Sequence, residues 1–131
     1  MDPITRLLAE PNPTIAVVGA SDRLDAYGAR IYRDLKAKGY RVLAVNPSRD
    51  TVDGDPAYPN LSALPEAPTI VNYVIPPPRT LRVLEEALRL GYTTAWVQPG
   101  AENEDVVRFL DENGFESLVG ACIMVESRAV A

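Results

Sequence analysis

Thr14-Ile15-Ala16-Val17-Val18-Gly19-Ala20-Ser21 sets the architecture that we expect of this chain. Its apolar run predicts a buried strand over residues 14–19, and a helical pattern begins soon after it, near Tyr27. In an open α/β sheet, the turn between such elements brings backbone N–H groups and a helix N-terminus to the carboxyl edge of the strands, where they can hold a phosphate. We therefore expect a phosphate group to bind at Gly19, Ala20 and Ser21.

The composition is that of one globular domain, which we place at residues 1–131. Hydrophobic residues make up 47% of the 131-residue chain and charged residues 24%, and both values are ordinary for a folded protein. The net charge of −5 argues against a nucleic-acid partner, because phosphate backbones select proteins with an excess of Lys and Arg. A phosphate site in this chain must be built locally, from backbone dipoles and a few arginines.

We predict no catalytic residue and no metal ligand. The chain has no histidine and a single cysteine, Cys122, which excludes an internal disulfide, a His-based zinc site and a Ser-His-Asp triad. No apolar run approaches the roughly 20 residues of a membrane span, and Asp2-Pro3-Ile4 does not begin a secretory signal. We expect a soluble, cytoplasmic protein with no membrane partner.

Predicted strands and helices alternate along the chain. After a short helix that begins at Asp2-Pro3, Tyr27, Ile31 and Leu35 form the apolar face of a helix over residues 27–38. Further strands are predicted over 41–45, 69–75, 93–97 and 116–119, and further helices over 80–90 and 103–113. A glycine followed by an aromatic residue precedes three of the strands, at Gly39-Tyr40, Gly91-Tyr92 and Gly114-Phe115. This alternation predicts an α/β fold, a Rossmann-like open parallel sheet of about five strands flanked by helices.

Three segments have less regular patterns. Residues 46–56 are too rich in turn-forming residues for a long helix. Pro76-Pro77-Pro78 predicts an extended segment at the exit of the third strand, because proline cannot continue a central ladder. Residues 122–125 fit either a strand end or a helical turn.

Three arginines follow the first three strands, one each: Arg23, Arg49 and Arg79. Ligands bind outside the carboxyl ends of the strands in this topology, and the planar guanidinium group suits phosphate because it donates hydrogen bonds in pairs. Arginines are also common in surface loops by chance, so both interpretations stay open for each of the three. At Gly19 and Ser21 we favour anion binding over the general need of such a turn for small residues.

The usual dinucleotide and NTPase motifs are absent. A G-x-G-x-x-G fingerprint that began at Gly19 would need glycine at positions 21 and 24, which are Ser21 and Leu24. In a dinucleotide site an acidic residue after the second strand binds the ribose. This chain has Asn46-Pro47 at that place. NAD is therefore disfavoured, and the absence of G-x-x-x-x-G-K-[ST] argues against an NTPase.

Five short motifs together resemble the stand-alone CoA-binding protein family. They are Gly19-Ala20-Ser21, Val45-Asn46-Pro47, the prolines after the third strand, Trp96-Val97-Gln98-Pro99-Gly100 and Cys122-Ile123-Met124. The resemblance runs from about Pro13 to Glu126. Proteins of this family are similar to the N-terminal domain of the succinyl-CoA synthetase α subunit and of NDP-forming acyl-CoA synthetases.

The resemblance implies a place for each part of coenzyme A. The pyrophosphate would lie at Gly19–Ser21 and the start of the Tyr27 helix. The adenosine would meet Val45, Pro47 and Arg49 on one side and Ile75 and Pro76 on the other, and the pantetheine would run along Gln98 and Gly100. Arg23 and Arg79 join this set from charge and position alone.

The expected function is non-catalytic binding of coenzyme A or a short acyl-CoA, for carriage, sensing or delivery to a partner enzyme. The synthetase reaction does not transfer with the resemblance, because this chain has no histidine to carry a phosphoryl group. Two alternatives stay open. One is an NAD(H)-binding redox sensor of the same fold, and the other is a component of an acyl-CoA synthetase or transferase that acts with another chain.

Cys122 allows two hypotheses. A small apolar residue at a strand exit is most often part of the core. Alternatively, its thiol lies near the thiol of CoA and forms a mixed disulfide with it or senses the redox state. Tyr73 and Trp96 lie within predicted strands, and we expect them to pack in the core.

Overall fold

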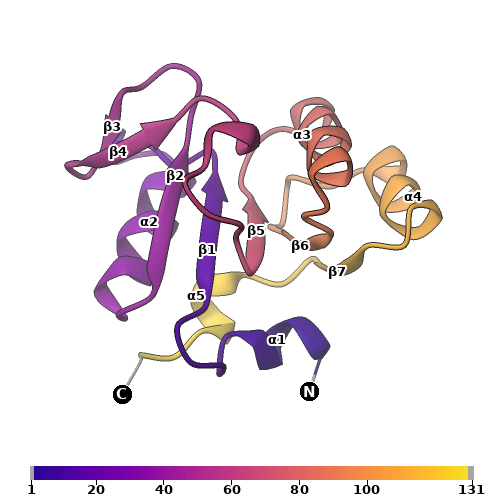
Figure 1. The fold of residues 1–131 in the computed structure, drawn as a ribbon, viewed down its shortest axis with the longest axis horizontal. Helices are drawn as coiled ribbons and strands as arrows, with labels where there is room; N and C mark the ends of the chain where they lie inside the picture. The colour runs from indigo at the N-terminus through magenta and orange to yellow at the C-terminus, as the bar shows by residue number, and fades with distance from the viewer. Residues whose placement is uncertain (1, 130–131) are drawn as a thin grey trace.

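The computed structural model describes residues 2–129, which form a seven-stranded sheet with helices on both faces (Figure 1). The strands are β1 (Thr14–Val18), β2 (Arg41–Val45), β3 (Thr51–Val52), β4 (Asp55–Tyr58), β5 (Ile70–Tyr73), β6 (Thr94–Val97) and β7 (Glu116–Val119). The helices are α1 (Pro3–Leu7), α2 (Tyr27–Ala37), α3 (Pro77–Leu90), α4 (Glu104–Glu112) and α5 (Ile123–Glu126), with a 3₁₀ turn, η1, at Leu61–Ala63.

The parallel sheet predicted from the sequence is confirmed. The strand order is β3-β4-β2-β1-β5-β6-β7, and every neighbouring pair except β3–β4 is parallel. The end of β1 is in register with the ends of both neighbours, because Val18 lies opposite Val45 of β2 and Tyr73 of β5. The chain moves from β1 to β2 on one side and later returns to β5 on the other. This reversal creates a topological switch point, where ligands bind in open α/β sheets.

Two apolar layers hold the sheet between the helices. Ile15 and Val17 of β1 pack on the side of α1, α2 and α5, and Ala16 and Val18 pack on the side of α3 and α4. All five residues of β1 are buried, as its unbroken apolar run predicts for a central parallel strand. Burial of each large aliphatic side chain contributes about 1.5–3 kcal/mol. Tyr73 and Trp96 are also fully buried, which confirms their predicted packing role.

The sheet has two more strands than the sequence predicts, because residues 51–58 form a hairpin. Thr51 pairs with Pro56 and Val52 with Asp55, which leaves a two-residue turn at Asp53 and Gly54. Both turn residues have positive φ, 51° and 78°, the geometry of a type I′ turn that matches the twist of paired strands. The Asp-Gly dipeptide is the feature of the sequence that indicates this hairpin.

Pro77 and Pro78 are helical, which corrects the prediction of an extended proline segment. They occupy the first turn of α3, and only Pro76, with φ −60° and ψ 149°, is extended. The first backbone N–H groups of a helix have no partner within it, so prolines there lose no hydrogen bond. The helix predicted over 80–90 therefore begins three residues earlier.

The glycine–aromatic links end their helices as predicted. Gly39, Gly91 and Gly114 have positive φ values of 97°, 81° and 68°. In each case the aromatic residue that follows donates its N–H to the carbonyl five residues earlier in the chain. Tyr40 donates to Leu35, Tyr92 to Ala87 and Phe115 to Leu110. This bond is the signature of a Schellman cap, which satisfies the last carbonyls of a helix.

The remaining boundaries follow the sequence closely, with one correction. Asp2 caps α1 through its side chain, and Asn103 caps α4 in the same way. Residues 123–126 form a helical turn and not a strand end. Ile31 and Leu35 are buried as predicted, but Tyr27, in the first turn of α2, is 44% exposed. The prediction that Tyr27 packs in the core with Ile31 and Leu35 is therefore wrong.

Candidate functional site

A cleft of about 870 Å³ lies at the carboxyl edge of the central strands. Its walls come from the ends of β1, β2 and β5, the loops that follow them, the loop between β4 and η1, and the first three turns of α3. The residues around it are Val18, Gly19, Ser21, Arg23, Ala26, Val45, Asn46, Pro47, Ser48, Arg49, Pro59, Asn60, Val74, Ile75, Pro76, Arg79, Arg82, Val83 and Glu86.

Most of the predicted site residues meet in this cleft. They are Gly19, Ser21, Arg23, Val45, Pro47, Arg49, Ile75, Pro76 and Arg79. Four predicted residues lie outside it. Ala20 and Gln98 are buried behind the sheet edge, Gly100 is exposed in the turn after β6, and Tyr27 is exposed at the start of α2. The cleft thus joins the predicted adenosine residues with Gly19 and Ser21 of the predicted phosphate turn. It excludes Ala20, Tyr27 and both residues of the predicted pantetheine path.

The turn after β1 requires glycine at two positions. Gly19 has φ 104°, and a Cβ added there would lie 2.4 Å from the Val74 carbonyl oxygen. A Cβ on Gly28, in the first turn of α2, would lie 1.9 Å from the Gly19 carbonyl oxygen. The start of α2 therefore rests directly on the turn, an arrangement that brings a helix N-terminus to a ligand. Gly28 was not among the predicted site residues, although a packing reason is the usual explanation for a glycine inside a predicted helix.

Free backbone donors face this turn. Within residues 2–129, the N–H groups of Ser21 and Asp22 donate to no protein acceptor, and neither do those of Tyr27 and Gly28. Ser21 and Gly28 are buried residues, and buried N–H groups in folded proteins nearly always have a partner. The Ser21 hydroxyl accepts a hydrogen bond from the Arg23 N–H at 3.0 Å, which shapes the loop. The turn is therefore equipped to hold an anion.

Asn46 joins the loops after β1 and β2. Its side-chain Nδ2 donates to the Ala20 carbonyl at 2.9 Å, and its Oδ1 accepts from the Ser48 N–H at 2.8 Å. From the sequence, Asn46 belongs to the Val45-Asn46-Pro47 motif and stands where a dinucleotide site has its acid, but this link between the two loops was not predicted. Asparagine can bridge two loops here because it both donates and accepts, which a carboxylate cannot do.

The arginines of the cleft differ in their partners. Arg23 pairs with Asp25 at 3.2 Å, but both side chains are at least 70% exposed, so this pair contributes little to stability. Arg49 is one-third exposed and lies 3.7 Å from Asp22. Among residues 2–129, Arg79 has no acidic partner within 4.0 Å. The cleft therefore offers cationic groups, of which Arg49 is more buried than Arg23.

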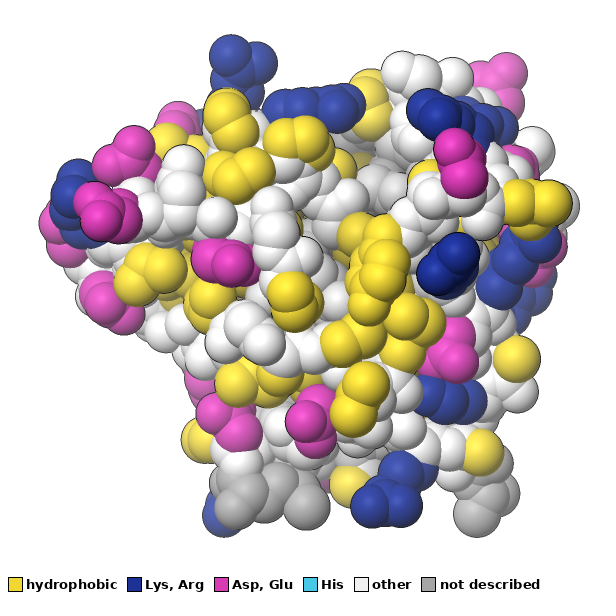
Figure 2. Space-filling view, turned by 180° about the vertical axis from the view of Figure 1, so that it is seen from behind, with side chains coloured by type: hydrophobic (Ala, Val, Ile, Leu, Met, Phe, Trp, Pro, Cys, Tyr) yellow, Lys and Arg dark blue, Asp and Glu magenta, His cyan; other side chains and the backbone are white. Residues whose placement is uncertain are grey.

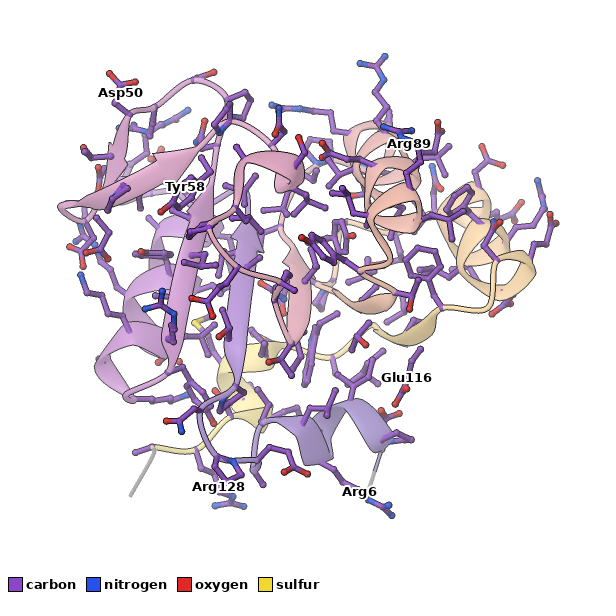
Figure 3. The ribbon with its side chains drawn as sticks, in the orientation of Figure 1. Arg6, Asp50, Tyr58, Arg89, Glu116 and Arg128 are labelled. Atoms are coloured by element: carbon purple, nitrogen blue, oxygen red, sulfur yellow. The ribbon has the colours of Figure 1, made fainter. Side chains whose placement is uncertain are left out.

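Acidic residues anchor the β3–β4 hairpin to α2 beside the cleft. Tyr32 donates its hydroxyl to Asp55 at 2.7 Å, and Lys36 lies 2.9 Å from the same carboxylate. The Lys36 and Tyr32 hydrogen bonds lower the pKa of Asp55 below its usual value. Asp22 accepts the Asp53 N–H at 2.8 Å, so the turn after β1 is also tied to the hairpin. Figure 3 shows Asp50 at the outer edge of this hairpin, whereas Arg6 and Arg128 lie at the opposite end of the molecule.

Cys122 is half-buried and belongs to neither apolar layer. Its exposure fits the hypothesis of an accessible thiol better than that of a core residue. Its Sγ lies 3.1 Å from the Tyr27 hydroxyl and 3.4 Å from Gln98 Nε2. Gln98 is 1% exposed and its Oε1 accepts the Ile123 N–H at 2.9 Å. Partial burial alone would raise the pKa of the thiol, but hydrogen bonds from Tyr27, Gln98 and two backbone N–H groups outweigh it and lower the pKa.

An open parallel sheet with a glycine turn after its first strand and a cleft at its carboxyl edge defines a Rossmann-like α/β domain. The sequence profile of the CoA binding domain family matches residues 13–128, and the chain belongs to this family. Coenzyme A is the ligand that gives the family its name.

Relatives with known sequences or structures are similar over most of the chain. YneT of Bacillus subtilis, an uncharacterized protein, is 32% identical over 111 residues, which are 85% of this chain and 82% of YneT. A conserved hypothetical protein of Pyrococcus furiosus has 43% identity and a TM-score of 0.85, over 88% of this chain and 99% of its own. A dinucleotide-forming acetyl-coenzyme A synthetase of Ca. Korarchaeum cryptofilum has 26% identity and a TM-score of 0.73, over 99% of this chain but 31% of the synthetase.

Residues 2–129 contain neither a membrane-spanning helix nor a metal-binding cluster. No helix within residues 2–129 combines the length and apolarity that crossing a membrane requires. The same residues contain no group of three or more Cys, Asp or Glu side chains placed to hold a metal ion.

Proposed function

We propose that this protein binds coenzyme A or a short acyl-CoA in the cleft at the carboxyl edge of its sheet, without catalysing a reaction on it. The observation that supports this most is the set of free N–H groups at Ser21, Asp22, Tyr27 and Gly28, in a chain of the CoA-binding domain family. Two of these donors belong to the turn after β1 and two to the first turn of α2, and free donors at a helix N-terminus suit a pyrophosphate. This arrangement needs no P-loop and no dinucleotide fingerprint.

The walls of the cleft suit the adenosine part of the ligand. Val45 and Pro47 lie on one side and Ile75 and Pro76 on the other, and flat apolar walls are typical of sites for a base. Arg49 and Arg79 supply the charges that a 3′-phosphate needs. The pantetheine would follow the expected path toward Gln98 and Gly100, which lie outside the cleft itself.

A carrier, sensor or delivery role is the proposed use of this binding. The chain lacks the histidine on which synthetase-type phosphoryl transfer depends. The similar part of the Korarchaeum synthetase makes up 31% of that chain, so in that protein such a domain works beside others. By analogy, we propose that this protein acts with a separate partner enzyme.

Titration calorimetry with CoA, acetyl-CoA and NADH tests the proposal. We expect CoA and acetyl-CoA to bind one per chain, and NADH to bind at least about tenfold more weakly, a difference of about 1.4 kcal/mol. Arg108→Ala, in an exposed residue of α4 outside the cleft, serves as the control and should bind CoA like the wild type. Preferential binding of NADH would replace the proposal with the redox-sensor alternative.

A further inference from the structure

Helix α3 lines the cleft with one face of its first three turns. Arg79, Arg82, Val83 and Glu86 are spaced by three, one and three residues, so they lie on the same side of the helix and all border the cleft. Glu86 is the one acidic side chain among the residues around the cleft. A carboxylate at this place is unexpected, because it repels the phosphates that the rest of the cleft suits.

One oxygen of Glu86 has a structural partner and the other does not. Oε1 accepts the Leu61 N–H at 3.1 Å, which joins α3 to η1. Within residues 2–129, Oε2 accepts no hydrogen bond and no Lys or Arg lies within 4.0 Å of the carboxylate, although Arg82 is one helical turn away. Glu86 is only half-buried, so its second oxygen is available to a donor that enters the cleft.

The charges around the cleft indicate which part of a ligand this donor belongs to. The free N–H groups after β1 and Arg49 suit phosphates, whereas Glu86 lies on α3 beside η1, with Val83 and Arg82 as its neighbours on the cleft face of the helix. Figure 1 shows η1 as part of the loop that returns from β4 across the sheet toward α3. A carboxylate acceptor beside Val83 fits a purine ring that carries an exocyclic amino group, because that amino group donates hydrogen bonds.

We propose that Glu86 selects the base of the ligand by accepting a hydrogen bond from the exocyclic amino group of adenine. This inference rests on the proposed function, because it assigns a specificity to the same cleft. A hydrogen bond to a charged acceptor is stronger than a neutral one. Loss of such a bond, with the carboxylate left unpaired against the ring, should weaken binding about tenfold or more.

The test compares CoA with 1,N6-etheno-CoA, in which the amino nitrogen is closed into a ring and carries no hydrogen. The wild type should bind CoA at least about tenfold more tightly than the etheno analogue. Glu86→Gln keeps an oxygen for the Leu61 N–H but places an amide donor where the second acceptor was. Compared with the wild type, this variant should bind CoA about tenfold more weakly. Its affinity for the etheno analogue should not fall.

Glu85→Gln provides the matched control, because Glu85 is exposed on the same helix and does not border the cleft. It should leave both affinities unchanged. Equal losses of both ligands in Glu86→Gln, or unchanged binding of CoA, would overturn base selection and leave CoA binding intact. If Glu86→Gln does not fold, the wild type alone decides. Equal affinities of the wild type for CoA and the etheno analogue would then overturn base selection. No binding of CoA to the wild type would overturn the proposed function, and base selection with it.

Discussion

The pKa of the Cys122 thiol depends on the groups around it. Hydrogen bonds from Tyr27 and Gln98 stabilise the thiolate and overcome the effect of partial burial, so folding lowers the pKa of this thiol. A thiol whose pKa is lowered by folding adds stability at high pH, and this contribution disappears as the pH falls through the pKa of the folded state. The same hydrogen bond raises the pKa of the Tyr27 hydroxyl.

Alkylation kinetics can measure this effect directly. The rate of reaction with iodoacetamide follows the thiolate fraction, so its midpoint should lie at lower pH in the folded wild type than in the protein unfolded in denaturant. Tyr27→Phe removes one donor and should move the midpoint upward. Tyr58→Phe, in a residue outside the cleft that is not bonded to Cys122, should not move it. An identical midpoint in the wild type and Tyr27→Phe would show that the hydroxyl does not stabilise the thiolate.

At the scale of elements, the contact between α2 and the turn after β1 determines whether the proposed phosphate site exists. Gly28→Ala would place a Cβ against the Gly19 carbonyl, and because this neighbour is backbone, the helix itself must shift. We expect a loss of stability of about 1–3 kcal/mol in chemical denaturation, although alanine is favoured over glycine in helices by about 1 kcal/mol. CoA binding should also weaken, since the N–H groups of α2 move with the helix.

Gly114→Ala separates the two effects. A Cβ at Gly114 meets no atom within 4 Å, but its φ of 68° is unfavourable for alanine, at a cost of about 1–2 kcal/mol. This variant should lose stability and keep full affinity for CoA. If Gly28→Ala binds CoA as tightly as Gly114→Ala does, then the start of α2 does not hold the phosphates.

At the scale of the whole molecule, the sequence predicted what depends on neighbouring residues and missed what depends on distant ones. The strand at Thr14–Val18, the cap at Asn103 and the glycine–aromatic links are local patterns, and all are confirmed. The β3–β4 hairpin was missed because its strands are only two and four residues long and contain no apolar run. Their stability comes from pairing with β2 and from ion pairs to α2.

The site divides in the same way. Gly19, Ser21 and Arg49 were predictable because a parallel sheet brings the ends of its central strands to one edge. Arg82 and Glu86 were missed because nothing in the sequence shows which face of α3 borders the cleft. Tyr27 has the spacing of a core residue, but at the first position of α2 it is exposed, on the α2 and α5 side of the sheet. On that face, hydrophobic side chains gather near the middle (Figure 2).

Thermal unfolding connects the cleft to the stability of the whole domain. A ligand that binds only the folded state, at a concentration 100 times its Kd, adds about 2.7 kcal/mol, which corresponds to a rise in Tm of about 8–13 °C for a domain of this size. We expect CoA to produce this rise. Arg49→Ala should reduce it, because Arg49 borders the cleft with part of its guanidinium group exposed.

The comparison with dephospho-CoA shows which phosphate Arg49 meets. If it binds the 3′-phosphate, Arg49→Ala should reduce the rise in Tm with CoA and leave the smaller rise with dephospho-CoA unchanged, because that ligand lacks the group. Arg108→Ala should change neither rise. Equal reductions with both ligands would place Arg49 at the pyrophosphate instead, next to the free N–H groups of Ser21 and Asp22. In that case Arg79, which has no acidic partner among residues 2–129, becomes the better candidate for the 3′-phosphate.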